Sequence, residues 1–273
     1  MTFRLLQVSD THLSADWPEV QGNFDILRAH VAALRPDLIV HTGDVAMDGA
    51  DSEADLRFGR DCMAGLAAPC RMLPGNHDVG DYAILGGSQS VNPGRMARWE
   101  AVLGDDGFVE DVPGWRLVGL NTQVLGSGLP QEGAQWARLE AGLAGAGDRR
   151  IAVFMHKPLC QERLADTQVD YWPVLQAERR RLAALLRGVD CAFIASGHIH
   201  QWRDRVADGL RQIWAPPVAF IVGEAAQPSF GSKMLGVVEH LLHPDGRFET
   251  RLLPLPGMAL HDIGQLRSAR VRR

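Results

Sequence analysis

Five short polar segments, each directly after an apolar run, constrain the fold of this chain more than any other feature. The clearest is Pro74–Asp78, where a Pro-Gly pair ends an apolar run and marks a turn. Gly75 allows the backbone to approach a ligand closely. Asn76, His77 and Asp78 offer an amide oxygen, an imidazole and a carboxylate. By itself this segment is equally consistent with an ordinary polar loop, so its meaning depends on the other four.

The apolar runs alternate with helical patterns in the first part of the chain. Buried strands are predicted at 3–9, 38–40 and 71–73, with amphipathic helices at 23–34 and 52–66 between them. This is a β-α-β-α-β arrangement with a polar segment at the carboxyl end of each strand. Open α/β sheets bind ligands at those ends, so distant segments are expected to converge there.

The later part of the chain has two more such strands and then changes character. Strands are predicted at 151–155, before His156, and at 189–195, before the segment Ser196–His200. Short strands separated by turns are predicted at 203–206, 210–214, 218–222, 233–241 and 248–252. We expect these late strands to form a second, largely antiparallel sheet.

Three irregular stretches are predicted to line the rim of a pocket, because binding residues are frequently carried by loops. They cover residues 79–94, 159–173 and 215–228. Tyr82, Tyr171 or Trp172 would stack on a base there, or serve only as packing residues.

Composition and charge restrict the classes of partner. Apolar residues make up 46% of the chain and charged residues 22%, which is ordinary globular usage. A net charge of −5 argues against a broad nucleic-acid surface but leaves a phosphate substrate open. The N-terminus lacks a signal-peptide pattern, and no apolar run approaches the about 18 residues that span a membrane. Four cysteines without a C-x-x-C pair predict reduced thiols in a cytoplasmic protein.

We expect one domain over residues 1–273, because the chain shows no internal repeat and no clear linker. Its basic end, about residues 265–273, is predicted to be a frayed, solvated tail.

The side chains at the strand ends form one set of candidate ligands, which contains five of the ten histidines: Asp10, His12, Asp44, Asn76, His77, His156, His198 and His200. Imidazole, carboxylate and amide oxygen suit Zn, Mn or Fe, and the lack of Cys argues against a structural zinc site. Pairs at i and i+2 would face the same side of an extended segment. Without His77, seven ligands are too many for one ion and suit two ions that share a carboxylate. Two ions about 3.5–4 Å apart hydrolyse phosphate esters in known enzymes.

The motifs Asp-x-His, Gly-Asp, Gly-Asn-His-Asp, a lone His and Gly-His-x-His follow one another between Asp10 and His200. In this order they resemble the calcineurin-like metallophosphoesterases, nearest to the bacterial class III cyclic-nucleotide phosphodiesterase branch. The resemblance implies an α/β fold, a four-layer α/β/β/α sandwich with two mixed sheets. A homodimer is an expectation from the family alone.

The resemblance also implies a role for each matching position. Asp44 would bridge two ions, and the remaining ligands would divide into two sets: Asp10, His12 and His200 for the first ion, and Asn76, His156 and His198 for the second. His77 would be catalytic, assisting the leaving group by protonating it or stabilising its charge. Asp78 would be the second catalytic residue and orient that imidazole.

These roles predict an enzyme that depends on two divalent or mixed-valence ions, Mn, Fe or Zn. It would hydrolyse a small phosphodiester, with a 3′,5′-cyclic nucleotide as one candidate, by attack of a metal-bridging hydroxide. The alternative is a phosphomonoesterase or nucleotidase. Few cationic side chains other than Arg71 and Lys157 lie near the motifs, which favours diesters. A non-catalytic binding scaffold is the remote alternative, since no ligand is missing.

Three further polar residues near the motifs receive structural interpretations. His41 is interpreted as a satisfied histidine inside a strand, with support of the ligands as the alternative. Asp48 is expected to shape its loop rather than act in catalysis, and Lys157 is expected to be a solvated loop lysine.

Overall fold

A computed structural model describes residues 1–271 and places the early strands in one sheet. Its order is β11-β10-β1-β2-β3, with β1, β2 and β3 parallel and β10 antiparallel to both of its neighbours. The strands are β1 (Phe3–Val8), β2 (Leu38–His41), β3 (Cys70–Met72), β10 (Val237–Leu242) and β11 (Phe248–Leu253).

The second sheet has the order β4-β5-β6-β7-β9-β8, with a parallel centre and an antiparallel strand at each edge. Its strands are β4 (Phe108–Val112), β5 (Trp115–Leu120), β6 (Arg150–Met155), β7 (Cys191–Ser196), β8 (Arg203–Ala207) and β9 (Leu210–Trp214). Both sheets are therefore mixed, as predicted.

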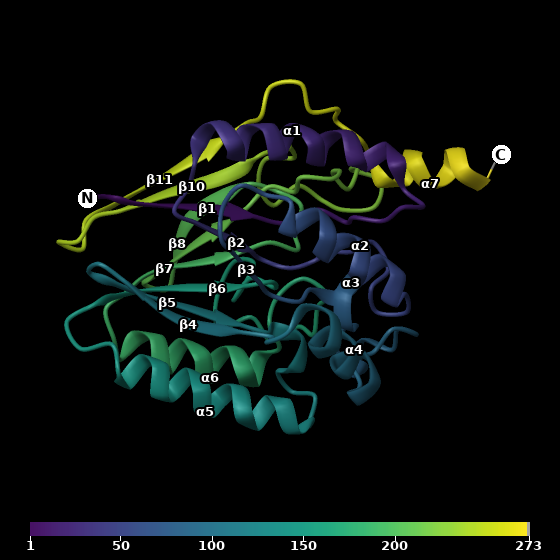
Figure 1. Cartoon of the computed structure of the whole chain (residues 1–273). Coiled ribbons are helices and arrows are strands. Elements are labelled where there is room, and N and C mark those ends of the chain that lie inside the picture. Colours follow the sequence, from purple (N-terminus) through teal and green to yellow (C-terminus); the bar gives the residue numbers. More distant parts are fainter. Residues whose placement is uncertain (272–273) are drawn as a thin grey trace.

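Helices cover the outer face of each sheet, and the two sheets face each other (Figure 1). Helices α1 (Pro18–Leu34), α2 (Glu53–Ala64) and α4 (Pro93–Leu103) share one apolar cluster with the first sheet. Helices α5 (Pro130–Ala144) and α6 (Gln176–Arg187) share another with the second sheet. A third cluster fills the space between the sheets. The four-layer α/β/β/α sandwich is confirmed.

The apolar strands divide their side chains between these layers, because successive residues of a strand face opposite sides. Leu5 of β1 lies between the sheets, whereas Leu6 packs under the helices. Ile39 and Val40 of β2 divide in the same way. Strands buried on both faces read as continuous apolar runs, which explains why these segments stand out in the sequence.

The prediction that the late strands form a sheet of their own is wrong. Strands β8 and β9 extend the second sheet, where β9 lies parallel to β7, and β10 and β11 complete the first sheet beside β1. Among the described residues, the segment 218–222 forms only a bridge, from Ile221 to Asp262. Strand propensity does not specify a strand's partner, so the sequence pattern could not assign these strands.

The basic end of the chain is also more ordered than expected. Residues 263–271 form helix α7 (Ile263–Val271), and Arg270 pairs with Glu19 and lies over the Trp17 ring at 3.8 Å. These contacts with the start of α1 hold a segment that was predicted to fray; residues 272 and 273 lie outside the described part. That the chain is a single domain stays a prediction.

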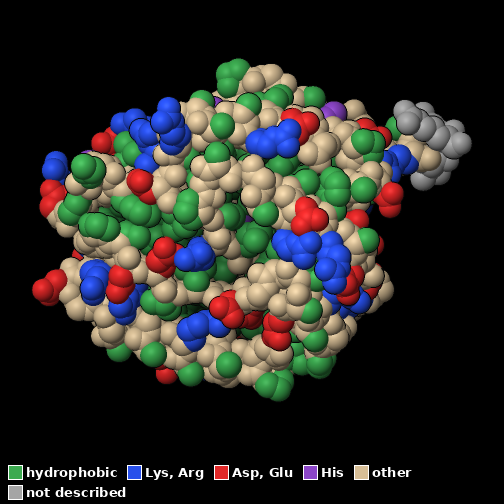
Figure 2. Space-filling view, viewed as in Figure 1, with side chains coloured by type: hydrophobic (Ala, Val, Ile, Leu, Met, Phe, Trp, Pro, Cys, Tyr) green, Lys and Arg blue, Asp and Glu red, His purple; other side chains and the backbone are tan. Residues whose placement is uncertain are grey.

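On the face shown in Figure 2, Lys and Arg side chains are interspersed with Asp and Glu. Within residues 1–271, no helix combines the length and the apolar character needed to cross a bilayer.

Candidate metal centre

The predicted ligands meet where strands of both sheets end. Asp10 and His12 follow β1, Asp44 follows β2, and Asn76 opens the short helix α3 (Asn76–Val79) after β3. The second sheet supplies the other three ligands after β6 and β7: His156, His198 and His200. All seven side chains are at most 8% exposed.

The cluster contains two groups that share one carboxylate. Asp10, His12, Asp44 and His200 form the first group, and Asp44, His156 and His198 form the second; within each, the candidate donor atoms lie within 4.8 Å of one another.

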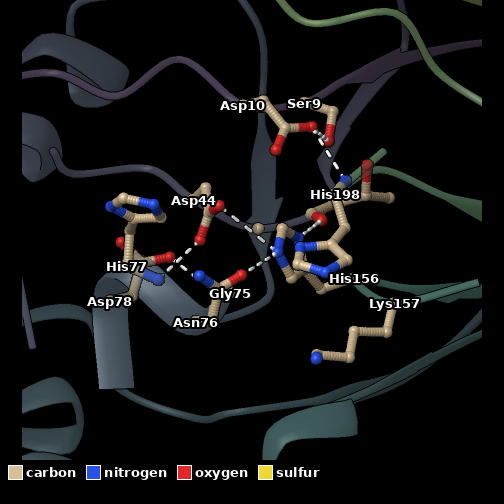
Figure 3. Close-up of polar contacts among 12 residues, drawn as sticks. Ser9, Asp10, Asp44, Gly75, Asn76, His77, Asp78, His156, Lys157 and His198 are labelled. Carbon is tan, nitrogen blue, oxygen red and sulfur yellow. Dashed lines mark hydrogen bonds and ion pairs between the residues drawn. The ribbon is translucent and has the colours of Figure 1, made fainter. Parts of the chain in front are cut away.

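Asp44 stands between the groups. Its Oδ2 lies 3.7 Å from Nε2 of His12 and 3.4 Å from Nε2 of His156. Asn76 belongs with the second group, because its Oδ1 lies 3.1 Å from His156 Nε2 (Figure 3). These are the two sets that the resemblance implies, and their assignment as ligands stays a prediction.

The backbone at these ligands is not extended. The prediction that ligands two residues apart face the same side of an extended segment is therefore wrong. Among the described residues, seven non-glycine residues have a positive φ, and five of them are candidate ligands: Asp10 (52°), His12 (42°), Asp44 (55°), His198 (67°) and His200 (55°). Asp, Asn and His tolerate this left-handed region better than most residues. The tight turns bring both members of each pair into the cluster, with strain concentrated at the site.

Two glycines of the motifs permit the close packing of the segments. A Cβ on Gly75 would lie 2.2 Å from Oδ1 of Asp44, and one on Gly197 would lie 1.8 Å from Oγ of Ser9. Only glycine fits at either position, so the Gly in Gly-Asn-His-Asp and in Gly-His-x-His has a steric cause.

Backbone carbonyls orient the imidazole rings. Nδ1 of His156 lies 2.8 Å from the Thr42 carbonyl oxygen, and Nδ1 of His200 lies 2.7 Å from that of Phe220. Such a contact holds the proton on one ring nitrogen and leaves the other free to bind metal. Nε2 is therefore the free atom of both rings, and it is Nε2 that faces the cluster.

The donor set fits a pair of divalent ions. Oδ1 of Asp10 is buried without a well-aligned hydrogen bond among the described residues, and Nε2 of His200 lies 3.3 Å from it. A buried carboxylate oxygen is costly unless a cation or donor compensates it. Nε2 of His12 and of His200 face each other at 3.1 Å. Burial lowers the pKa of His12 well below its ordinary value, so its neutral ring keeps a lone pair.

The second group has a different electrostatic balance. Burial lowers the pKa of His156, but the nearby Asp44 carboxylate outweighs it and raises that pKa to about 9. A divalent cation would satisfy the same carboxylate and displace the proton. The cluster therefore suits a dinuclear site for divalent metal ions.

His77 lies beside the cluster with a different partner from the one predicted. Its ring is 4.6 Å from that of His12, its backbone N–H donates to Oδ1 of Asp44, and its Nδ1 lies 2.7 Å from the Met47 carbonyl oxygen. The prediction that Asp78 orients this imidazole is wrong. The Asp78 carboxylate accepts backbone N–H groups of Val45, Ala46 and Gly75 instead, so it holds the 44–46 and 75–78 turns together.

Lys157 was expected to be solvated, and the structure corrects this. Its side chain is fully buried; Nζ lies 2.8 Å from Oδ1 of Asp81 and also donates to the Tyr171 carbonyl oxygen. In Figure 3 the Lys157 side chain lies below the His156 ring, and no dashed line joins the two. The sequence cannot distinguish a buried lysine from a solvated loop lysine, because the difference depends on the partners that the fold brings to it.

His41 and Asp48 have supporting contacts. Nε2 of His41 lies 2.9 Å from the hydroxyl of Thr11, a residue that stands between two candidate ligands in the sequence. Nδ1 of His41 accepts a hydrogen bond from the Gly43 N–H. His41 is thus a satisfied strand histidine that also supports the 10–12 turn. Asp48 accepts a hydrogen bond from Gln89, as a loop-shaping residue would.

A pocket of about 310 Å³ opens beside Asn76 and His77. The loop that follows α3 forms most of its wall, with Leu85, Gly87, Ser88, Gln89 and Ser90, and Tyr171 closes another side. Tyr82 also lines it, but its ring is buried and its hydroxyl donates to the Thr122 carbonyl. Loops 79–94 and 159–173 thus both border the pocket. The contacts of Tyr171 with the candidate ligands Asn76 and His198 were not predicted, since only stacking on a base or packing was suggested for it.

With this geometry established, comparison with known proteins gives the family. The sequence model of the calcineurin-like phosphoesterases matches residues 3–202. The chain belongs to this family. It is accordingly a metal-dependent phosphoester hydrolase, and curated relatives carry phosphodiesterase names.

Two relatives and one solved structure illustrate the similarity. The "3',5'-cyclic adenosine monophosphate phosphodiesterase CpdA" of Pseudomonas aeruginosa is 30% identical over 261 residues, covering 90% of this chain and 88% of the relative. The "Probable glycerophosphodiester phosphodiesterase GpdQ" of Arcobacter nitrofigilis is 28% identical over 214 residues, covering 72% and 71%. A dimetal phosphatase from Danio rerio superposes with a TM-score of 0.58 at 14% identity, covering 93% of this chain and 99% of that one. This last likeness concerns the fold.

Proposed function

We propose that this phosphoesterase hydrolyses small phosphodiesters, with 3′,5′-cyclic nucleotides as the leading candidates. The observation that carries the proposal is the pair of ligand groups joined by Asp44, with His77 beside them in the wall of a pocket. The names of the relatives support the substrate class, since both describe phosphodiester hydrolysis. Two bound divalent ions would supply Lewis acidity and a nucleophile at neutral pH.

His77 is suited to assist the leaving oxygen. The Met47 carbonyl accepts its Nδ1–H at 2.7 Å, which fixes the orientation of the ring and leaves Nε2 free to face the leaving oxygen. The ring is partly exposed and borders the pocket, whereas the candidate ligands are buried. A donor at this place can protonate an alcohol as it leaves.

The pocket favours an uncharged substituent over a second phosphate charge. Among its described lining residues, Asp81 is the one carboxylate, and it is paired with Lys157. The described wall contains no Lys or Arg side chain, so it offers no added positive charge to balance the extra negative charge of a monoester. The neutral hydroxyl and amide groups of Ser88, Ser90 and Gln89 suit a sugar or base.

The phosphomonoesterase alternative is separated by one comparison. Manganese-loaded protein is expected to release nitrophenol from bis(p-nitrophenyl) phosphate with a higher kcat/KM than from p-nitrophenyl phosphate. A higher value for the monoester would support the alternative, and no release from the diester would overturn the proposal.

Side-chain chemistry supports a proposal for the metals and for the compartment. Histidine, carboxylate and amide donors without thiolate suit Mn, Fe or Zn. The four cysteines are free thiols, which is consistent with a reducing compartment such as the cytoplasm. Metal analysis of protein purified without added metal would test the first inference.

A further inference from the structure

Tyr171 contacts two of the residues proposed for the second ion. It lies in the irregular loop between β6 and α6, outside all five motifs. Its hydroxyl accepts a hydrogen bond from Nδ2 of Asn76 at 3.0 Å, and its carbonyl oxygen lies 3.2 Å from Nε2 of His198. Its ring is also 4.8 Å from the His198 ring.

Both contacts decide which atom of a ligand faces the metal position. An asparagine amide binds metal through oxygen and not through nitrogen. Because the Tyr171 hydroxyl accepts a hydrogen bond from Nδ2 of Asn76, Oδ1 of Asn76 faces His156. A neutral histidine carries one N–H, and the Tyr171 carbonyl selects the form of His198 with that proton on Nε2. Nδ1 of His198 then keeps its lone pair.

The first group does not depend on Tyr171. His200 is oriented by the Phe220 carbonyl, and Oδ2 of Asp10 accepts hydrogen bonds from the Ser9 hydroxyl at 2.5 Å and from the His198 N–H at 3.1 Å. His156, in the second group, is held by Thr42. Only Asn76 and His198 have their donor atoms selected by the loop residue.

Lys157 anchors Tyr171. Its Nζ donates to the Tyr171 carbonyl, lies 2.8 Å from Asp81, and sits 4.8 Å above the Tyr171 ring and 4.5 Å above the Tyr82 ring. A fully buried ammonium is costly unless charge and hydrogen bonds compensate it, so these contacts hold one another in place. The Tyr171 carbonyl oxygen has two lone pairs, so it can accept hydrogen bonds from Lys157 and His198 together.

We propose that Tyr171 is a positioning residue that selects the donor atoms of Asn76 and His198, and that the Lys157–Asp81 pair holds it in position. The proposal rests on the dinuclear site of the proposed function. It predicts that the two ions depend unequally on one loop: loss of Tyr171 contacts weakens the second ion and spares the first.

The test measures Mn²⁺ binding to the full-length, metal-free protein by titration calorimetry. A parallel titration with diamagnetic Zn²⁺, followed by the ¹⁵N shifts of the His198 and His200 ring nitrogens, identifies which site fills. Tyr171→Phe removes the hydroxyl contact with Asn76 and is expected to weaken the second ion by about 10–100-fold, the usual effect of losing an outer partner of a ligand. The first ion should keep its affinity within about twofold.

The chain offers a matched control, because Tyr82 is its only other tyrosine. Tyr82→Phe removes a buried hydroxyl whose partner is the Thr122 carbonyl, and it should change neither ion. Equal affinities in all three proteins, or a parallel weakening of both ions, would overturn the proposal.

Lys157→Met tests the carbonyl contact. It is expected to give the same selective loss, and ¹⁵N spectra of the metal-free variant should show His198 in a mixture of tautomers. If this variant does not fold, Tyr171→Phe decides by itself. The measurement contains no substrate, so selective loss in a protein that hydrolyses no diester would support this inference and reject the proposed function. Fewer than two ions on the unaltered protein would overturn both.

Discussion

At the scale of single residues, ligands sit on backbone that is costly to form. Five candidate ligands have a positive φ, a conformation that costs a non-glycine residue roughly 1–2 kcal/mol. The surrounding structure holds these turns, and the turns bring the carboxylate and imidazole groups together. The site therefore stores strain that the fold must offset elsewhere.

A substitution pair tests this strain. In the metal-free protein, His200→Gly is expected to be more stable than His200→Ala by about 1 kcal/mol, because glycine adopts a positive φ without penalty. His156 has no positive φ, so its Gly variant should be less stable than its Ala variant. Urea denaturation gives the free energy of unfolding of the four variants. If the Gly and Ala variants had the same order of stability at both positions, the prediction would be contradicted.

His77 is predicted to act on the reaction rather than on the metal. His77→Ala should reduce kcat by roughly 10²–10⁴-fold, the usual contribution of a positioned proton donor, with two Mn²⁺ ions still bound. Turnover of bis(p-nitrophenyl) phosphate and metal analysis of the same sample check this. Loss of an ion would show that His77 is a ligand.

At the scale of elements, the sequence predicted regular segments better than loops. The helix predicted from residue 52 begins with Ser52 as its N-cap, whose hydroxyl accepts the Asp55 N–H, because a cap is a local feature. Strand β1 was equally clear, since it is buried on both faces. The loop after α3 had no such pattern, and its shape depends on contacts such as Gln89 with Asp48 and Asp51.

This loop also offers a test of the pocket. Gly87 lines it, and a Cβ added there would meet no atom within 4 Å, so Gly87→Leu should fold normally and occupy part of the space. We expect KM for bis(p-nitrophenyl) phosphate to rise by roughly tenfold, as pocket changes worth 1–3 kcal/mol do. Gly133→Leu, equally unobstructed in α5, is the control. An unchanged KM would place the substrate elsewhere.

At the scale of the whole molecule, the site exists only where the two sheets meet. The first sheet supplies Asp10, His12, Asp44 and Asn76, and the second supplies the three remaining histidines. The sheets dock through an apolar core that lies between them, and this docking brings the two sets of strand ends together. His240 takes part in that interface: its ring is stacked on Phe193 at 4.7 Å and is fully buried.

Burial lowers the pKa of His240 to about 3, and this predicts a pH dependence of stability. Between that pKa and the ordinary value near 6.5, the unfolded chain binds a proton that the folded protein does not. The free energy of unfolding should therefore fall as the pH drops below about 6.5, by up to roughly 1.4 kcal/mol per pH unit. Urea denaturation of metal-free protein from pH 7 to 5 should show a steeper loss than in His240→Gln. Parallel curves for the two proteins would contradict the assignment.

The sequence by itself determined the buried strands, the five polar segments at their ends and the kinds of donor atom they carry. Apolar patterning, turn residues and ligand chemistry are local properties of the chain, so they are visible without a structure. Only the tertiary structure decided which sheet β8 to β11 join, that Lys157 is buried, and that Met47 rather than Asp78 holds His77. These outcomes depend on which segments pack together, and a linear pattern does not encode that choice of partner.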